Sequence, residues 1–317
     1  ETARRSVALQ KGSSINGASD QEIATLHTCV EKALSHWDPT VREEGLKLLC
    51  VSKRTSDMPT EREMNTLRMF VPLSLKTYCH RTSSDGGRSR STTLMKTFLR
   101  RVHDGMKTAQ TKLTKEKVRQ KAQQQIQQGD DNATKVNRAR EERAIAIEKK
   151  CLGTIRSGTE FVRWMCTFLL DAMHPGSSFE RSSTSLEMLL LMVRIWKDDT
   201  NRMTPVGEEN KTTTHVLSPL MERSAVLVLL RATVVTWDRV RELSCQILAD
   251  LPWHGFEKEA DMTDVVGMAM HLAGSPRRRE YEAGAQILHM LHERHVQLNG
   301  WSLILSTGGD MDLVEDI

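Results

Sequence analysis

The stretch that decides the fold is HPGSSFERSSTSLEMLLLMV, residues 174–193. Pro175 and Gly176 are typical of a turn, and Ser177 or Ser178 can cap the free amides at the start of a helix. Apolar residues then recur at helical spacing, as they also do before the turn, in residues 161–172. The stretch therefore predicts two amphipathic helices joined by a short turn.

Three further segments share this plan, at residues 37–49, 237–248 and 275–288. Each has a turn, a charged anchor, mostly small residues three and four positions after the anchor, and an apolar residue seven positions after it. The anchors are Arg42, Arg181, Arg241 and Glu280, and the small residues include Gly45 and Gly284. Small side chains let one helix approach its neighbour closely, and the anchors at 241 and 280 lie 39 residues apart, near the period of HEAT repeats.

These segments predict an all-α fold, a HEAT/armadillo-like α-α superhelical repeat array. The alternative is a globular bundle of generic amphipathic helices. The run AVLVLLRATVV, residues 225–235, fits a buried strand as well as a helix, and its length and flanks favour the helix. We expect repeats over residues 1–104 and 151–317, with a polar loop at 197–215.

The segment between them, residues 105–150, is predicted to be a basic, Gln-rich insert. Residues 100–150 hold 14 Lys or Arg against 7 Asp or Glu, a net charge of +7, whereas the whole chain has +4. The insert is either a solvated helix pair around the GDDN break or a mobile loop. It serves either as a solvated insertion or as a surface for phosphate backbones. No aromatic residues interleave the charges, so base stacking is not expected there.

No motif in the chain predicts catalysis, a cofactor or a metal site. His289, His292 and His295 are spaced at i, i+3 and i+6, but HERH lacks the HExxH spacing of zinc enzymes. The six cysteines lack CxxC spacing, which favours buried free thiols in a reducing compartment. No apolar run approaches the length of a membrane span. We therefore expect a cytoplasmic protein that is not an enzyme.

The series WDPTVREEGLKLL, RSRSTTLMKTFLRRVHD, the PGSSF turn, WDRVRELSCQILADLP and SPRRREYEAGAQIL resembles the thyroid adenoma-associated protein family in order and rough spacing. Members of that family are large helical-repeat proteins that regulate a tRNA 2′-O-methyltransferase acting on the anticodon loop. The resemblance implies a non-catalytic scaffold with two partners, the methyltransferase and tRNA. It also implies an internal segment upstream of, or bordering, the family's domain of unknown function.

On this hypothesis the candidate tRNA-phosphate contacts are the basic residues of SPRRRE and of the insert and its flank. Three consecutive arginines at a helix start favour phosphate binding, although a solvated turn is an equal alternative. The candidates are Arg277, Arg278 and Arg279, followed by Arg100, Arg101, Lys115, Lys117, Arg119 and Lys121. The alternative function is a protein-only HEAT-repeat adaptor, of a transport or trafficking type, without RNA binding.

Overall fold

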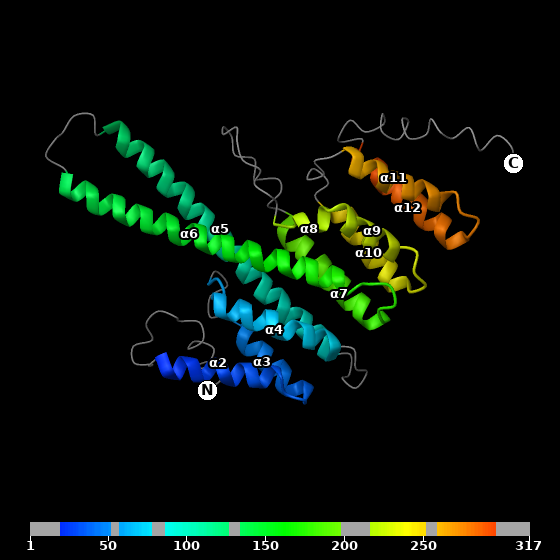
Figure 1. Ribbon diagram of the computed structural model, residues 1–317, viewed down its shortest axis with the longest axis horizontal. Coiled ribbons are helices and arrows are strands. Elements are labelled where there is room, and N and C mark those ends of the chain that lie inside the picture. The colour runs from blue at the N-terminus through cyan, green and yellow to red at the C-terminus, as the bar shows by residue number, and fades with distance from the viewer. Residues whose placement is uncertain are drawn as a thin grey trace. The chain divides into compact units, whose positions relative to one another are not determined.

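The computed structural model describes residues 20–51, 57–77, 86–126, 134–197, 216–251 and 259–295, and within them the regular structure is helical throughout. The helices are α2 (Asp20–Leu34), α3 (Pro39–Cys50), α4 (Glu61–Thr77), α5 (Gly86–Ile126), α6 (Thr134–Asp171), α7 (Phe179–Trp196), α8 (Ser218–Met221), α9 (Arg223–Ala232), α10 (Asp238–Asp250), α11 (Glu259–Ala273) and α12 (Arg278–His295) (Figure 1). The predicted all-α fold is confirmed. The run that also fitted a strand, residues 225–235, is helical at its start, where residues 225–232 belong to α9.

The chain divides into two compact units, residues 1–162 and 163–317. The boundary therefore falls inside α6. The predicted polar loop at 197–215 lies outside the described residues apart from Lys197.

Within each unit helices pack both inside a pair and between successive pairs. In the first unit α2 packs on α3, and α3 packs on α5; in the second, α7 packs on α10, α9 on α11 and α11 on α12. α3, α7 and α10 carry the anchors Arg42, Arg181 and Arg241, so α7 and α10 are the second helices of successive pairs. α9 and α11, the first helices of their pairs, also touch. This neighbour-on-neighbour packing is what a repeat array requires.

The turn at the start of the quoted stretch joins α6 to α7. Gly176 has φ of +89°, a conformation that L side chains rarely adopt, and this explains glycine at that position. The Ser177 hydroxyl donates to the Ala172 carbonyl at 2.9 Å, and the Arg181 amide donates to the Ser178 hydroxyl at 3.3 Å. Ser178 is thus the N-cap of α7.

Two of the four anchors, Arg42 and Glu280, bind the turn that precedes their own helix, and a third, Arg241, binds the first residue of its own helix. Arg42 donates from Nη1 to the carbonyls of His36 (2.6 Å) and Trp37 (2.8 Å). Arg241 pairs with the Asp238 carboxylate. Glu280 accepts hydrogen bonds from Ser275 at 2.5 Å and from Arg277 at 3.1 Å. The anchors therefore hold the entry of the chain into the second helix of a pair.

Small residues lie where paired helices come closest. A Cβ atom at Gly45 of α3 would lie 3.0 Å from the Ala33 Cβ of α2, and one at Gly284 of α12 would lie 2.6 Å from the Leu272 carbonyl carbon of α11. In α10 the corresponding residue, Ser244, is fully buried and donates to the Leu229 carbonyl of α9 at 2.5 Å. A larger side chain at these positions would force the two helices apart.

Arg101, which the sequence grouped with the tRNA contacts, is buried instead, with only 1% of its surface exposed. Its guanidinium donates to the carbonyls of Leu49 (3.1 Å) and Cys50 (3.2 Å) at the end of α3, and to the Asp57 carbonyl (3.1 Å). These α3 carbonyls have no intrahelical partner, so an arginine of α5 caps the C-terminus of α3. The guanidinium is therefore not available to a phosphate.

The buried partner of Arg101 is Glu63 in α4, whose carboxylate lies 3.9 Å from Nη2. Glu63 also forms a capping box with Thr60, since it accepts from the Thr60 amide at 2.6 Å while its own amide donates to the Thr60 hydroxyl at 3.2 Å. Burial raises the pKa of the Glu63 carboxyl and lowers the pKa of Arg101, and each group's charge opposes the other's shift. One cluster thus joins α3, α4 and α5.

Replacing Gly284 by Ala should lower the free energy of unfolding by about 1–2 kcal/mol, because the new methyl group meets the backbone of α11. The matched control is Gly267→Ala in the same hairpin. A Cβ at 267 meets nothing within 4 Å, so this change should raise stability by up to about 1 kcal/mol through helix propensity. Urea unfolding measures both variants, and equal midpoints would contradict the close approach.

Replacing Arg101 by Met should cost about 3–5 kcal/mol, because the carbonyls at the end of α3 lose their buried donor and Glu63 loses its buried opposite charge. The neighbouring Arg100→Met removes the same charge from an exposed position and should leave the urea midpoint unchanged. A small effect of Arg101→Met on stability would argue against a structural role for this guanidinium.

Candidate nucleic-acid interface

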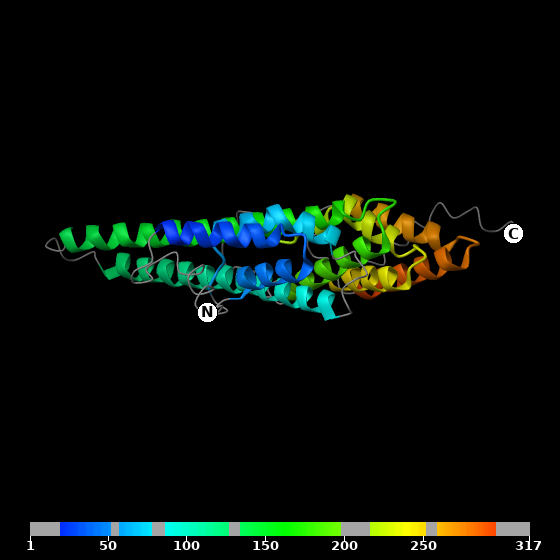
Figure 2. The same ribbon diagram turned by 90° about the horizontal axis from the view of Figure 1, so that it is seen from below.

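The insert is carried by two long antiparallel helices, α5 of 41 residues and α6 of 38 residues. Residues 105–126 and 134–150 are helical, so the described part of the insert is the helix pair and not the loop. The ring centroids of Phe98 and Phe161 lie 5.7 Å apart, and a Cβ at Gly158 would lie 2.5 Å from the Met106 Sδ. Figures 1 and 2 show the α5–α6 hairpin projecting beyond α2, α3 and α4.

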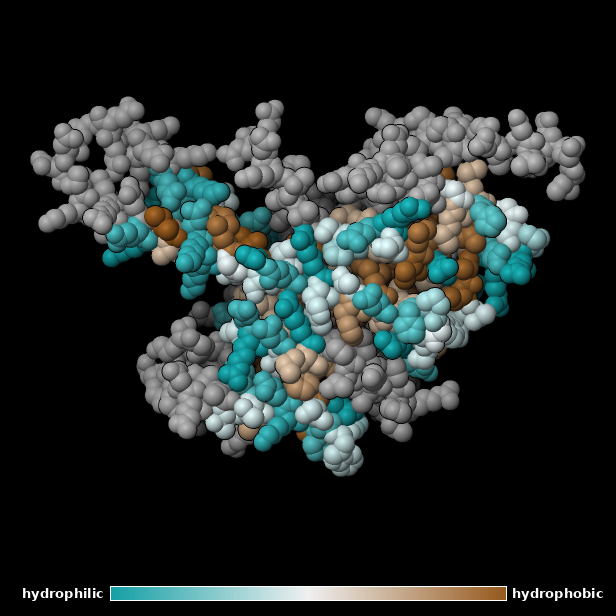
Figure 3. Space-filling model, viewed as in Figure 1, coloured by the Kyte–Doolittle hydropathy of each residue, from teal (hydrophilic) through white to brown (hydrophobic). Residues whose placement is uncertain are grey.

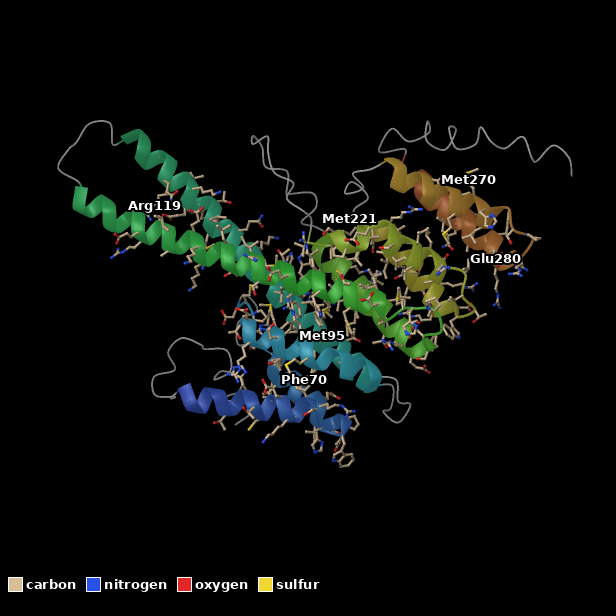
Figure 4. The ribbon with its side chains drawn as sticks, viewed as in Figure 1. Phe70, Met95, Arg119, Met221, Met270 and Glu280 are labelled. Atoms are coloured by element: carbon tan, nitrogen blue, oxygen red, sulfur yellow. The ribbon has the colours of Figure 1, made fainter. Side chains whose placement is uncertain are left out.

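One stripe of α5 gathers exposed cations. Lys112, Lys115 and Arg119 are spaced at i, i+3 and i+7, which places them on one face of the helix. Among the described residues none of the three forms an ion pair, and we call them the α5 basic stripe. Glu116 is the single acidic residue between positions 105 and 126. Figure 4 places Arg119 on the projecting part of α5.

The other α5 candidates are less well placed. Lys117 is exposed but points to a different side of the helix from the α5 basic stripe, by its sequence spacing. Arg100 is exposed nearer the base of the hairpin, and Arg101 is buried as described above. Lys121 lies within α5, and its side chain falls outside the described residues.

The arginines of SPRRRE are exposed at the start of α12, and two of them are paired. Arg277 donates to Glu280 at 3.1 Å, and Arg278 donates to Glu282 at 2.7 Å. The hydrogen bond that Arg278 donates to Glu282 raises the pKa of Arg278, and hydrogen bonds donated by Ser275 and Arg277 lower the pKa of Glu280. Glu280 is labelled at the start of α12 in Figure 4.

Arg279 is the member of the triplet that has no carboxylate partner among the described residues. Each glutamate offsets the positive charge of the arginine that it binds, so the triplet presents one uncompensated cation instead of three. The α5 basic stripe is therefore the stronger candidate for a polyanion, and Arg279 is the weaker one.

The histidines that the sequence singled out form no metal site among the described residues. His289 is exposed on α12, and the side chains of His292 and His295 fall outside the described residues. No group of three His, Cys, Asp or Glu side chains among the described residues could hold a metal ion. In the same part of the chain, every helix is too short or too polar to cross a membrane.

Sequence reasoning missed Lys112, and it missed exposed apolar residues on α6. Ile145 is 62% exposed and Leu152 is 49% exposed. Their spacing of seven residues puts both on one helical stripe, a signal that is readable in the sequence. The many charged residues of the segment make this apolar spacing hard to recognise in the sequence.

Comparison with known proteins places these features in a family. The family model described as "Trm732, TPR repeats" matches residues 7–242. The tRNA (32-2′-O)-methyltransferase regulator THADA of Mus musculus is 22% identical over 265 residues, and that of Canis lupus familiaris is 21% identical over 264 residues. Each alignment covers 83% of this chain and 12% of the relative, so the chain spans about an eighth of these proteins. No solved structure matches.

The family description names the repeats TPR, which are antiparallel helix pairs like those seen in both units. The matched residues include the helices α2 to α9, and therefore the whole α5–α6 hairpin. The resemblance to the thyroid adenoma-associated proteins is confirmed by the relatives. The match extends over more than half of the sequence, and the chain belongs to the Trm732 TPR-repeat family.

Proposed function

We propose that this chain is part of a non-catalytic scaffold that assists a tRNA 2′-O-methyltransferase in ribose methylation of the anticodon loop. Family membership and the names of the two relatives support the regulatory role. Catalysis would then reside in the partner enzyme. A cytoplasmic location belongs to the same proposal, and the free state of the five described cysteines supports a reducing compartment.

The observation that carries the tRNA part of the proposal is the α5 basic stripe. Lys112, Lys115 and Arg119 are exposed on a projecting helix and form no ion pair among the described residues, and Glu116 is the carboxylate that shares their face of α5. Unpaired cations on a helix release counterions when they meet a phosphate backbone, and this gives affinity without sequence selection. Such contacts position a tRNA, while the methyltransferase selects the nucleotide.

Reversing two charges of the stripe, in Lys115→Glu with Arg119→Glu, should weaken tRNA binding by about tenfold or more. It should also flatten the dependence of log K on log[salt] by about 1.5, because two phosphate contacts are lost. The measurement is binding of labelled tRNA to the full-length protein at several salt concentrations, with and without the methyltransferase.

Arg277→Glu with Arg278→Glu is the matched control, because it makes the same change in net charge where glutamates already bind both arginines. The control should change tRNA affinity much less than the α5 double variant. If the two double variants lose tRNA affinity equally, the loss reflects the net charge of the protein, and the assignment of the tRNA contacts to α5 is wrong. A full-length protein that binds no tRNA in either condition would favour the protein-only adaptor.

A further inference from the structure

The α5 basic stripe continues the line of α5 residues that faces the end of α3. Arg101 precedes Lys112 by eleven residues and Arg119 by eighteen, which are about three and about five turns of a helix. At the base of the hairpin this line is buried, because Arg101 donates to the carbonyls of Leu49 at 3.1 Å and Cys50 at 3.2 Å. Farther along α5 the same line is exposed and cationic. The buried contacts at the base therefore fix the direction in which the stripe faces.

α6 covers a different side of α5 from the stripe. Met106 and Ala109 of α5 are buried, and a Cβ at Gly158 of α6 would lie 2.5 Å from the Met106 Sδ. By helical spacing, Ala109 and Met106 lie about 60° and about 120° around α5 from Lys112. Glu116 lies between that side and the stripe and is half-buried. The exposed flank therefore carries three cations against one carboxylate, and Figure 3 shows hydrophilic surface beside hydrophobic surface on the projecting hairpin.

The hairpin offers cations but no surface on which bases could stack. Residues 99–160 contain no Phe, Tyr or Trp, and the two aromatic residues at its base, Phe98 and Phe161, are fully buried against each other. Single-stranded RNA is recognised mainly through splayed bases that stack on aromatic side chains or arginine planes, whereas double-stranded RNA is recognised through its shape and backbone. The composition of the hairpin therefore favours a double helix.

The length and the rigidity of the stripe suit the backbone of a double helix. Lys112 and Arg119 are seven residues apart, or about 10 Å along α5. In double-stranded DNA each strand places one phosphate about every 3.4 Å of the axis, and the spacing in RNA is of the same order, so about three phosphates of one strand face this length. A double helix holds these phosphates in a fixed geometry, whereas a single strand would first have to be ordered along the stripe, at a cost in free energy.

We propose that the α5 basic stripe binds a double-helical stem of the tRNA, through consecutive phosphates of one strand, and does not contact the single-stranded loop. The inference rests on the proposed function, which supplies the identity of the RNA. The major groove of an A-form helix is too deep and narrow for side chains to read, so the helix pair meets the stem from outside. This arrangement leaves the anticodon loop free, and the ribose that is methylated must enter the partner enzyme.

Replacing Lys112 and Lys115 by Gln should weaken binding of an anticodon-arm hairpin RNA to the full-length protein by about tenfold. It should also lower the dependence of log K on log[salt] by about 1.5, because two phosphate contacts are lost. The measurement is binding of the labelled hairpin at several salt concentrations. Gln is a good helix former, so the circular dichroism spectrum should stay as in the wild type.

The matched control is Lys107→Gln with Lys117→Gln. It removes the same two charges from exposed positions of α5, each about 140° around the helix from Lys112. The control should bind the hairpin RNA with the affinity and the salt dependence of the wild type.

Two altered hairpin RNAs separate the stem from the loop. The first keeps the stem and carries an unrelated loop, and it should bind within about twofold of the original, because the phosphates of the stem are unchanged. The second keeps the loop and changes one strand so that the stem cannot pair, and it should bind at least about tenfold more weakly. A compensating change in the other strand restores pairing and should restore binding.

Failure of this inference gives a different result from failure of the proposed function. Unpaired RNA that binds as tightly as the stem would overturn the inference, and so would equal losses for the stripe variant and its control. If the wild type binds whole tRNA through the stripe but does not bind the stem hairpins, the proposed function stands and the stem is the wrong ligand. If the wild type binds no tRNA, with or without the methyltransferase, the tRNA part of the proposed function itself is wrong.

Discussion

The structure depends on how closely two helices of a pair can approach. At Gly45 and Gly284 the neighbouring helix lies so near that a single methyl group would meet its backbone or side chains, and at Ser244 a hydroxyl reaches across to the Leu229 carbonyl. Close approach buries the apolar residues on both sides of the seam, such as Leu34 and Leu49 in the first pair. The anchors complete the arrangement, because they hold the turn from which the second helix starts.

Charge in this chain has opposite roles at adjacent positions. Arg101 is buried, caps the end of α3 and faces Glu63, whereas Arg100 is exposed to solvent. The buried guanidinium donates its hydrogen bonds to groups of the protein itself, so it is not available to bind a ligand. The same reasoning separates Arg277 and Arg278, which bind glutamates, from Lys112, Lys115 and Arg119, which form no ion pair among the described residues. Partners thus decide which cations are available for recognition.

The α5–α6 hairpin shows how a repeat pair can gain a binding element without a new core. Near its base the two helices share buried residues such as Phe98 and Phe161, as other pairs do. Farther along the hairpin Ala109 and Ala144 are buried, and the exposed surface carries basic residues together with apolar ones such as Val118 and Ile145. This extension costs little apolar surface and presents the α5 basic stripe on one of its sides.

The sequence by itself determined the helical class, the position of the turns and the plan of the pairs, because these depend on local spacing. Ser178 caps α7, Gly176 has a positive φ, and Gly45 lies at a close approach where the pattern of small residues predicted one. The family resemblance also came from these local segments. Ambiguity remained where a short apolar run fits both a strand and a helix, as in residues 225–235, and in the insert, whose pattern fits a helix pair or a loop.

Only the tertiary structure decided which charged and apolar residues are available to a partner. Arg100 and Arg101 are both arginines and are adjacent in the sequence. One is exposed and the other is buried, because successive residues of a helix point in directions about 100° apart. Arg101 turns toward the end of α3, a segment about fifty residues earlier in the chain. Ile145 and Ala144 separate in the same way on α6. Exposure depends on what other segments bring to each face, and local spacing does not contain that information.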